Sequence, residues 1–204
     1  PSRPLIKPAK IHGASIPELI NNLELPELRT RYRTRRELRG RDSEAVTNAV
    51  VAWSANKEER LQLEALWVTW GAGRLHQPLM KKLLKSSDHR IRAAAMNVLR
   101  FHFSSVPEAK ELLTNAANDS HGRVRMTAAV TASYLPRKIG LETLASADDQ
   151  NESAIYKQTF DYAREVLNRQ PAESELKERK IAAPSHLSAE HKKLFVAGSE
   201  IYAR

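Results

Sequence analysis

A short basic motif recurs along this chain at steps of 29, 30 and 33 residues. The run from Ser87 to His102 carries it most clearly, because Arg90-Ile-Arg is followed by Ala95 and then by Leu99. Comparable triplets begin at residues 31, 60 and 123, and a weaker copy begins at residue 154. Periods of this length are typical of stacked two-helix units, none of which can bury its apolar face alone.

The apolar residues of the clearest copy recur with helical spacing. They stand at positions i, i+3, i+4, i+7 and i+8, which share one face of an α-helix: Ile91, Ala94, Ala95, Val98 and Leu99. Residues 57–70 are apolar on two faces, which predicts a helix buried between neighbours. We find no run with the alternation of a half-buried strand. The sequence therefore predicts an all-α fold, an α-solenoid (α-α superhelix) of about five helix pairs.

Proline and charge divide the chain into four segments. Residues 1–14 contain three prolines and are expected to form an extended arm, whereas residues 15–169 carry the repeats. Residues 170–187 contain Pro171, Pro184 and a charged run, and are predicted to be a linker. Residues 188–204 are predicted to form a last helix that belongs to a following domain. Because the chain starts at Pro1 without a methionine or a signal sequence, we expect it to be a piece of a longer polypeptide.

The residue types that enzymes use are poorly arranged here. Cysteine is absent, which excludes a disulfide, a thiolate metal site and a cysteine nucleophile. The seven histidines show no metal-ligand spacing on one helix, and Glu58, Glu59 and Glu64 form no acid/base pair. No apolar run approaches the roughly 18 residues that a membrane span needs. We therefore expect a segment with no catalytic residues and no cofactor of its own.

The net charge of +9 is concentrated in one place, because seven arginines stand between residues 29 and 41. Arg29, Arg33 and Arg36 share one side of a predicted helix and form a candidate interface or anion-binding patch. Arg31 and Arg35 lie where a first repeat would contact the rest. We favour structural pairing or a domain interface for this cluster over nucleic-acid binding.

The pattern Asp-x-x-Φ-Arg-x-x-Ala at residues 88–95, where Φ is apolar, resembles the HEAT-repeat family over residues 15–169. In that family an arginine and an inter-helix aspartate form a ladder between repeats. The resemblance implies that Arg92 and Arg125 are ladder donors, with Asp88 and Asp119 as candidate acceptors. Arg33 matches less well. The pattern is broken by two residues, Gln62 and Lys157.

A closer resemblance covers most of the chain. The runs at residues 29–39, 63–67 and 90–93 are similar to the HEAT region of large membrane-bound dehydrogenase-like proteins of planctomycetes and verrucomicrobia. Those proteins join a sorbosone-dehydrogenase-type β-propeller, a helical region and a c-type cytochrome. Leu194, Phe195, Gly198 and Tyr202 resemble the cytochrome helix that leads into the haem-attachment motif.

The resemblance implies a non-catalytic scaffold whose partners are neighbouring protein domains. Without cysteine this segment cannot attach haem covalently, so a c-type haem is expected in the domain that follows. A periplasmic or otherwise exported location follows from the resemblance alone. The alternative is a nucleic-acid-binding HEAT protein, such as an alkylpurine-DNA-glycosylase-like enzyme, in which Trp53, Trp67 and Trp70 would line a base-stacking cleft. Their spacing favours core positions instead.

Overall fold

The computed structural model describes residues 7–147 and 153–171, and helices account for all the regular secondary structure there. The all-α prediction is confirmed over this part of the chain, which contains ten α-helices and two 3-10 turns. The helices are α1 (Ile16–Asn21), α2 (Leu28–Arg39), α3 (Ser43–Ser54), α4 (Glu59–Gly71), α5 (Gln77–Leu83), α6 (His89–His102), α7 (Ala109–Ala117), α8 (Gly122–Ser133), α9 (Arg137–Ser146) and α10 (Ala154–Arg169). The 3-10 turns are η1 (Asn22–Glu24) and η2 (Phe103–Ser105).

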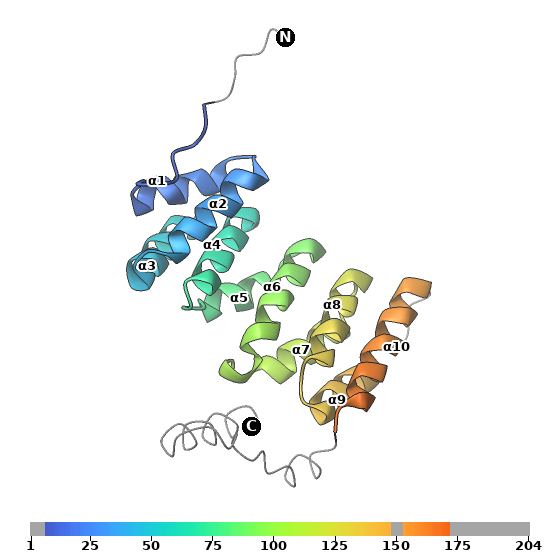
Figure 1. The fold of residues 1–204 in the computed structure, drawn as a ribbon. Coiled ribbons are helices and arrows are strands. Elements are labelled where there is room, and N and C mark those ends of the chain that lie inside the picture. The colour runs from blue at the N-terminus through green and yellow to red at the C-terminus, as the bar shows by residue number, and fades with distance from the viewer. Residues whose placement is uncertain (1–6, 148–152, 172–204) are drawn as a thin grey trace, which may run out of the picture.

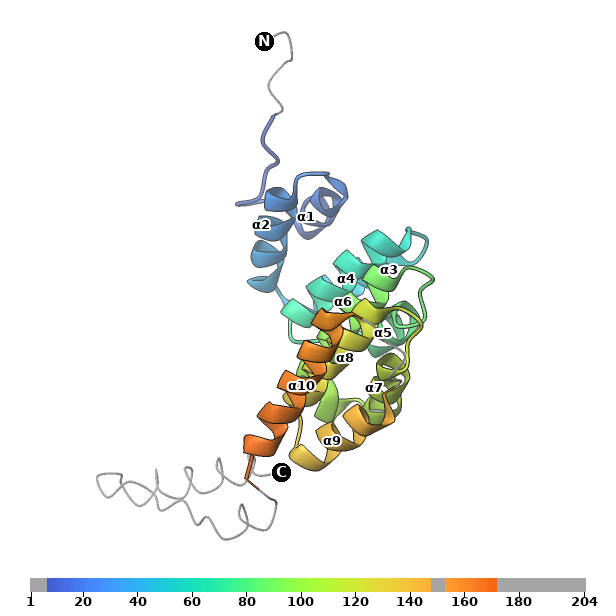
Figure 2. The same ribbon diagram turned by 90° about the vertical axis from the view of Figure 1, so that its right-hand side faces the viewer.

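The helices pack as two layers. Helices α2, α4, α6, α8 and α10 follow one another in a row (Figure 1), and each contacts the next member of that row. The odd-numbered helices lie behind them, and each contacts the even-numbered helix that follows it in sequence (Figure 2). The motif that recurs in the sequence falls on the even-numbered helices, so the row is the part of the fold that the repeat specifies.

Short polar residues define where several helices begin. The Ser15 hydroxyl accepts a hydrogen bond from the Glu18 N–H and the Glu18 carboxylate accepts one from the Ser15 N–H, and this pair of bonds forms a capping box at the start of α1. The Asp42 carboxylate caps α3 by accepting from the Ala45 N–H, and the Asp88 carboxylate caps α6 by accepting from the Arg90 N–H. These caps satisfy N–H groups that have no partner inside the helix.

The spacing of Ser105 and Glu108 in the sequence also predicts a capping box, which the structure does not contain. Ser105 instead ends η2, and its hydroxyl donates to the His102 carbonyl at 2.9 Å. Because α6 continues into this extra turn, the serine lies too early in the chain to cap α7. That helix begins at Ala109 without a side-chain cap.

Helix α4 lies at the centre of the core, as its two apolar faces predict. Leu66 and Ala65 are fully buried, and Leu61, Leu63 and Val68 are at most 7% exposed. Neighbours α2, α3, α5 and α6 all contact this helix. Burial on every side explains why the sequence of α4 has no polar face in its central turns.

The residues before α1 form no helix over 7–14, and they are joined to the first helices by hydrogen bonds. The Asn22 amide donates to the Lys10 carbonyl at 2.9 Å, and Arg41 donates to the Ala14 carbonyl at 3.1 Å. The predicted final helix and nearly all of the predicted linker lie outside the described residues. Among the helices that are described, none is both long and apolar enough to cross a membrane.

Candidate functional site

One side chain near the start of each of four row helices donates to the loop just before that helix. Arg92 donates to the Ser86 and Ser87 carbonyls at 2.8 and 3.1 Å. Arg31 makes the equivalent pair of bonds to the Leu25 and Pro26 carbonyls, both at 2.8 Å. No turn, loop or cap N–H of the described residues donates to these carbonyls, so the guanidinium satisfies acceptors that the backbone leaves open.

In α8 and α4 the equivalent side chains, Arg125 and Gln62, make one bond each to the preceding loop. Arg125 of α8 donates to the Asp119 carbonyl. Gln62 of α4 donates to the Lys57 carbonyl at 2.7 Å, which replaces the guanidinium by a shorter amide. Gln62 therefore still bonds the preceding loop, but it makes no bond to a neighbouring helix pair.

Arg92 also spans two helix pairs. Its Nε and Nη2 atoms each donate at 2.7 Å to a different carboxylate oxygen of Asp119, which lies in the loop before α8. The hydrogen bonds that Arg92 donates to the Asp119 carboxylate raise the pKa of Arg92. Burial raises the pKa of the Asp119 carboxyl, but hydrogen bonds from Arg92 and the His121 N–H outweigh burial and leave that pKa below its usual value. Both groups are therefore charged at neutral pH.

The first two pairs are joined by a buried carboxylate. Glu64 of α4 is 2% exposed, and it accepts from Arg31 Nε at 3.0 Å and from Arg35 Nη1. A buried carboxylate is costly unless it is paired. Arg31 and Arg35 thus pair inside the fold, and Arg41 of the same cluster bonds Glu37 and the Ala14 carbonyl, so three of the seven clustered arginines have a structural role.

The remaining neighbours are joined by weaker contacts. Between the second and third pairs, the Ser86 hydroxyl donates to the Glu59 carboxylate. Between the fourth and fifth pairs, the Arg125 guanidinium lies 5.3 Å from the centre of the Tyr156 ring. Each neighbouring two pairs therefore share at least one polar or cation–π contact in addition to their apolar packing.

Two of the predicted ladder residues have other roles. Asp88, a candidate acceptor, caps α6 and holds Arg90 of the same turn at 2.7 Å, and that hydrogen bond lowers its pKa to about 2. Arg33 does not take the ladder position in α2, because Arg31 does. Helix α2 has arginines at residues 31 and 33. Of these two, only Arg31 bonds the preceding loop and Glu64.

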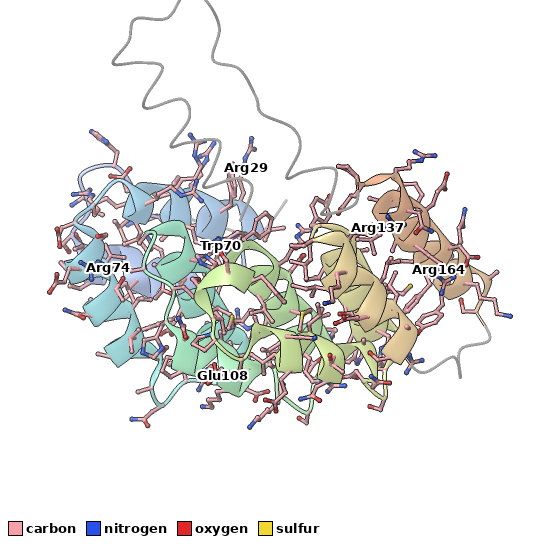
Figure 3. All side chains as sticks on the ribbon, turned by 90° about the horizontal axis from the view of Figure 1, so that it is seen from below. Arg29, Trp70, Arg74, Glu108, Arg137 and Arg164 are labelled. Carbon is pink, nitrogen blue, oxygen red and sulfur yellow. The ribbon has the colours of Figure 1, made fainter. Side chains whose placement is uncertain are left out.

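The candidate patch of Arg29, Arg33 and Arg36 is exposed (Arg29 is labelled in Figure 3). Within the described part of the chain none of the three forms an ion pair. Arg36 lies 6.0 Å from the centre of the Tyr32 ring. The patch is therefore a set of solvated cations on the outer side of α2, and the structure gives it no internal role.

The three tryptophans lie at the edge of the core and do not share a cleft. Trp53 donates to the Glu24 carboxylate at 3.1 Å, and Trp67 has the Arg35 guanidinium 5.1 Å from its ring centre. Trp70 stacks on Phe101 with ring centres 5.1 Å apart. Each is packed against the core on one side, so the interpretation as core-packing residues holds and each ring is also partly open.

The histidines bring no metal-ligand set together within the described residues. His89 and His121 instead stack face to face, with ring centres 3.5 Å apart and planes within 5° of parallel. His121 caps α8, and its Nδ1 accepts from the Arg123 N–H at 3.1 Å. His89 is the first residue of α6 and His121 is the N-cap residue of α8, so the stack joins the starts of two neighbouring row helices, a contact that the sequence pattern did not indicate.

Sequence analysis also missed a run of aromatic and arginine side chains at the carboxyl ends of the row helices. It includes Phe101 and Tyr134, which are 57% and 70% exposed. A signal was present, because an aromatic residue stands ten or eleven positions after the start of three triplets, at Trp70, Phe101 and Tyr134. No protein-family model, curated protein or solved structure matches the chain.

Proposed function

We propose that residues 15–169 form an α-solenoid of five HEAT-like pairs that acts as a non-catalytic scaffold between protein domains. The observation that carries this proposal is the set of side-chain contacts between successive pairs. Arg31 with Glu64, and Arg92 with Asp119, each join a loop or helix of one pair to the next. A row of helices held in this way keeps fixed distances along its length, which is what a scaffold requires.

The finer proposal rests on the resemblance in the sequence. The scaffold joins a dehydrogenase-like propeller to a cytochrome c domain in a larger exported bacterial redox protein. The haem belongs to the following domain, and this segment contributes positioning. Its partners are then neighbouring domains of the same polypeptide, which bind to the exposed sides of the helices.

The reading frame on both sides of this segment provides the first test. We expect a Cys-x-x-Cys-His motif soon after Arg204 and a β-propeller sequence before Pro1. Expression of that longer chain with periplasmic haem maturation should give a c-type haem spectrum, and the 204-residue protein should give none. A chain that ends at Arg204, or continues without the haem motif, would refute the redox assignment and leave the scaffold proposal.

A second candidate function is nucleic-acid binding, and the charge of the row favours it. Helix α2 has six arginines against one acidic residue, Glu37, and helices α6 and α8 contain no acidic residue. Phosphate binding by several arginines loses about 10³–10⁵ in affinity between about 50 and 200 mM salt. Submicromolar, lesion-dependent DNA binding that persists at physiological salt would favour this candidate over the scaffold.

A further inference from the structure

A continuous line of aromatic and arginine side chains runs along the carboxyl ends of the row helices. We call Trp70, Arg100, Phe101 and Tyr134 the aromatic ridge. Trp70 stacks on Phe101 with ring centres 5.1 Å apart. The Arg100 guanidinium lies 4.5 Å from the centre of the Phe101 ring and 4.8 Å from that of Tyr134. The ridge therefore joins α4, α6 and the end of α8 through contacts between its own members.

Arginines continue the ridge at both ends. On the α2 side, the Arg39 guanidinium lies beside Gly71, where a Cβ would stand 3.5 Å from its Nε. On the α9 side, Arg137 begins the helix that follows Tyr134, and Figure 3 labels it together with Trp70. The surface thus alternates between cationic and aromatic groups from α2 to α9.

These cations have no acidic partner in the described residues. Arg39, Arg100 and Arg137 form no ion pair there, although thirteen ion pairs connect other residues. The Nε atoms of Arg100 and Arg137 are buried without a hydrogen-bond acceptor. Because the protein supplies no acidic partner, the charge of these guanidinium groups is open to pairing with a carboxylate of another molecule.

The fixed orientation of Arg100 is suited to binding a carboxylate. A guanidinium held against two rings has lost most of its rotational freedom, and it still presents donors in a planar fork. Binding by such a group costs less ordering than binding by a free arginine. Tryptophan, tyrosine and arginine are also the residues that dominate the energy of protein–protein interfaces.

The same contacts argue against nucleic acid at this surface. Base stacking needs an unoccupied aromatic face. Phe101 already has Trp70 and Arg100 against it, and Tyr134 has Arg100. Phe101 and Tyr134 remain 57% and 70% exposed beside guanidinium groups without an acidic partner, which suits a mixed apolar and acidic protein surface.

We propose that the aromatic ridge is the docking surface for an acidic protein segment in which aspartate or glutamate flanks apolar residues. Carboxylates of that segment pair with Arg39, Arg100 and Arg137, and its apolar side chains pack on Phe101 and Tyr134. The proposal rests on the proposed scaffold function, because it assumes a protein partner, and it assigns the face and the chemistry of that partner.

The test selects peptides from a displayed library of random sequences, each about 16 residues long, at about 150 mM salt. The wild-type protein should enrich peptides that combine acidic and apolar residues. Fluorescence anisotropy then measures the binding of one synthetic selected peptide to the double variant Arg100→Gln/Tyr134→Ser. We expect a loss of affinity of about tenfold or more, since both residues belong to the type that carries interface energy.

The chain offers a matched control, Arg29→Gln/Tyr32→Ser. It makes the same two replacements on α2, where Tyr32 is 53% exposed, and it removes the same charge. Affinity for the peptide should change less than about threefold, because exposed charges act on binding mainly through screened long-range attraction. Circular dichroism and thermal unfolding of both variants would establish that each is folded.

Three outcomes would overturn the proposal. One is that no acidic peptide is enriched, and another is that the two double variants lose affinity equally. The third is that an oligothymidine of about 20 nucleotides binds the ridge at about 150 mM salt more tightly than the selected peptide. Any of these outcomes would show that the ridge is not a docking surface for an acidic protein segment. The scaffold proposal would still stand or fall by its own test, the sequence that flanks this segment.

Discussion

Arg92 and Asp119 form a two-point ion pair between successive helix pairs, with one guanidinium N–H on each carboxylate oxygen at 2.7 Å. Both side chains are largely buried, at 14% and 13% exposure. Arg92 also donates to two loop carbonyls and Asp119 accepts from the His121 N–H at 2.8 Å, so each group has further partners that fix its position. The pair is therefore oriented before it forms, which lowers the entropy cost of making it.

Replacing both members of this pair should reveal coupling between them. In a double-mutant cycle with Arg92→Ala and Asp119→Ala, we expect a coupling energy of about 1–3 kcal/mol in the free energy of unfolding, because a bidentate pair in a partly buried site is weakly screened. Urea unfolding of the four proteins measures it. Coupling below about 0.3 kcal/mol would mean that the two side chains act independently.

The pair of Asp88 and Arg90 provides the control for that cycle. It has the same chemistry and a 2.7 Å contact, but Arg90 is 72% exposed and the pair lies within one turn. Solvent and salt screen such a pair strongly. We expect Arg90→Ala to change the free energy of unfolding much less than Arg92→Ala, and a similar loss in both would remove the special role of the pair between repeats.

Leu66→Ala should destabilise the protein by about 2–5 kcal/mol, the range for emptying a closed core site. Leu66 is fully buried in α4, which has neighbours on every side, so the cavity cannot collapse easily. Leu28→Ala, at a site that is 66% exposed, should cost less than about 0.5 kcal/mol. Chemical denaturation measures both, and a loss below about 1 kcal/mol for Leu66→Ala would contradict the central place of α4.

Gly140→Ala should also destabilise, through overpacking. A Cβ at Gly140 would stand 2.6 Å from the Ala132 carbonyl oxygen and 2.5 Å from Leu167, so α9 would have to move away from α8 or α10. We expect a cost of about 1–3 kcal/mol. Thermal unfolding, analysed together with a denaturant titration, measures it.

Gly40→Ala is the matched control, because a Cβ there meets only the Glu37 carbonyl oxygen at 3.5 Å. Its φ of −84° is open to alanine. This variant should be neutral or stabilised by up to about 1 kcal/mol, since alanine reduces the freedom of the unfolded chain. Equal effects at the two glycines would show that the close approach of α9 is not the cause.

The helices could be predicted from sequence because their apolar spacing is local. The ladder could be predicted only in part. Helices α6 and α2 each begin with two arginines two residues apart, Arg90 and Arg92 in α6 and Arg31 and Arg33 in α2. The second of the two reaches the neighbouring pair in α6 and the first does so in α2, and local spacing cannot decide between them. That choice depends on how two helices rotate against each other, which is a property of the packed fold.

The aromatic ridge shows a different limit of sequence reasoning. Trp70, Phe101 and Tyr134 lie about 30 residues apart in the chain and become neighbours only when the row forms. Their similar distance from each triplet, ten or eleven residues, is visible in the sequence, but the helix-face pattern assigns Phe101 and Tyr134 no inward role. Exposed residues are constrained by partners, and a single sequence contains no information about those.

The stacked histidines predict a loss of stability in mild acid. Loss of hydration lowers the pKa of His89 first, and the nearby charge of His121 lowers it further. The charge of Asp88 raises the pKa of His89, whereas the charges of Arg90 and of Arg123 in α8 lower it. The folded protein thus binds fewer protons at His89 than the unfolded chain does, so this contribution is present above the unfolded pKa of about 6.5 and is lost as the pH falls through the folded pKa.

We therefore expect the urea midpoint of the wild type to fall between about pH 7.5 and 5.5. The variant His89→Phe keeps an aromatic ring against His121 and has no titrating group at that position. Its urea midpoint should fall less over the same interval, and the difference between the two proteins should appear only on the acid side. If the two midpoints shift in parallel, the stack has no part in the acid sensitivity, and other groups of the fold must account for it.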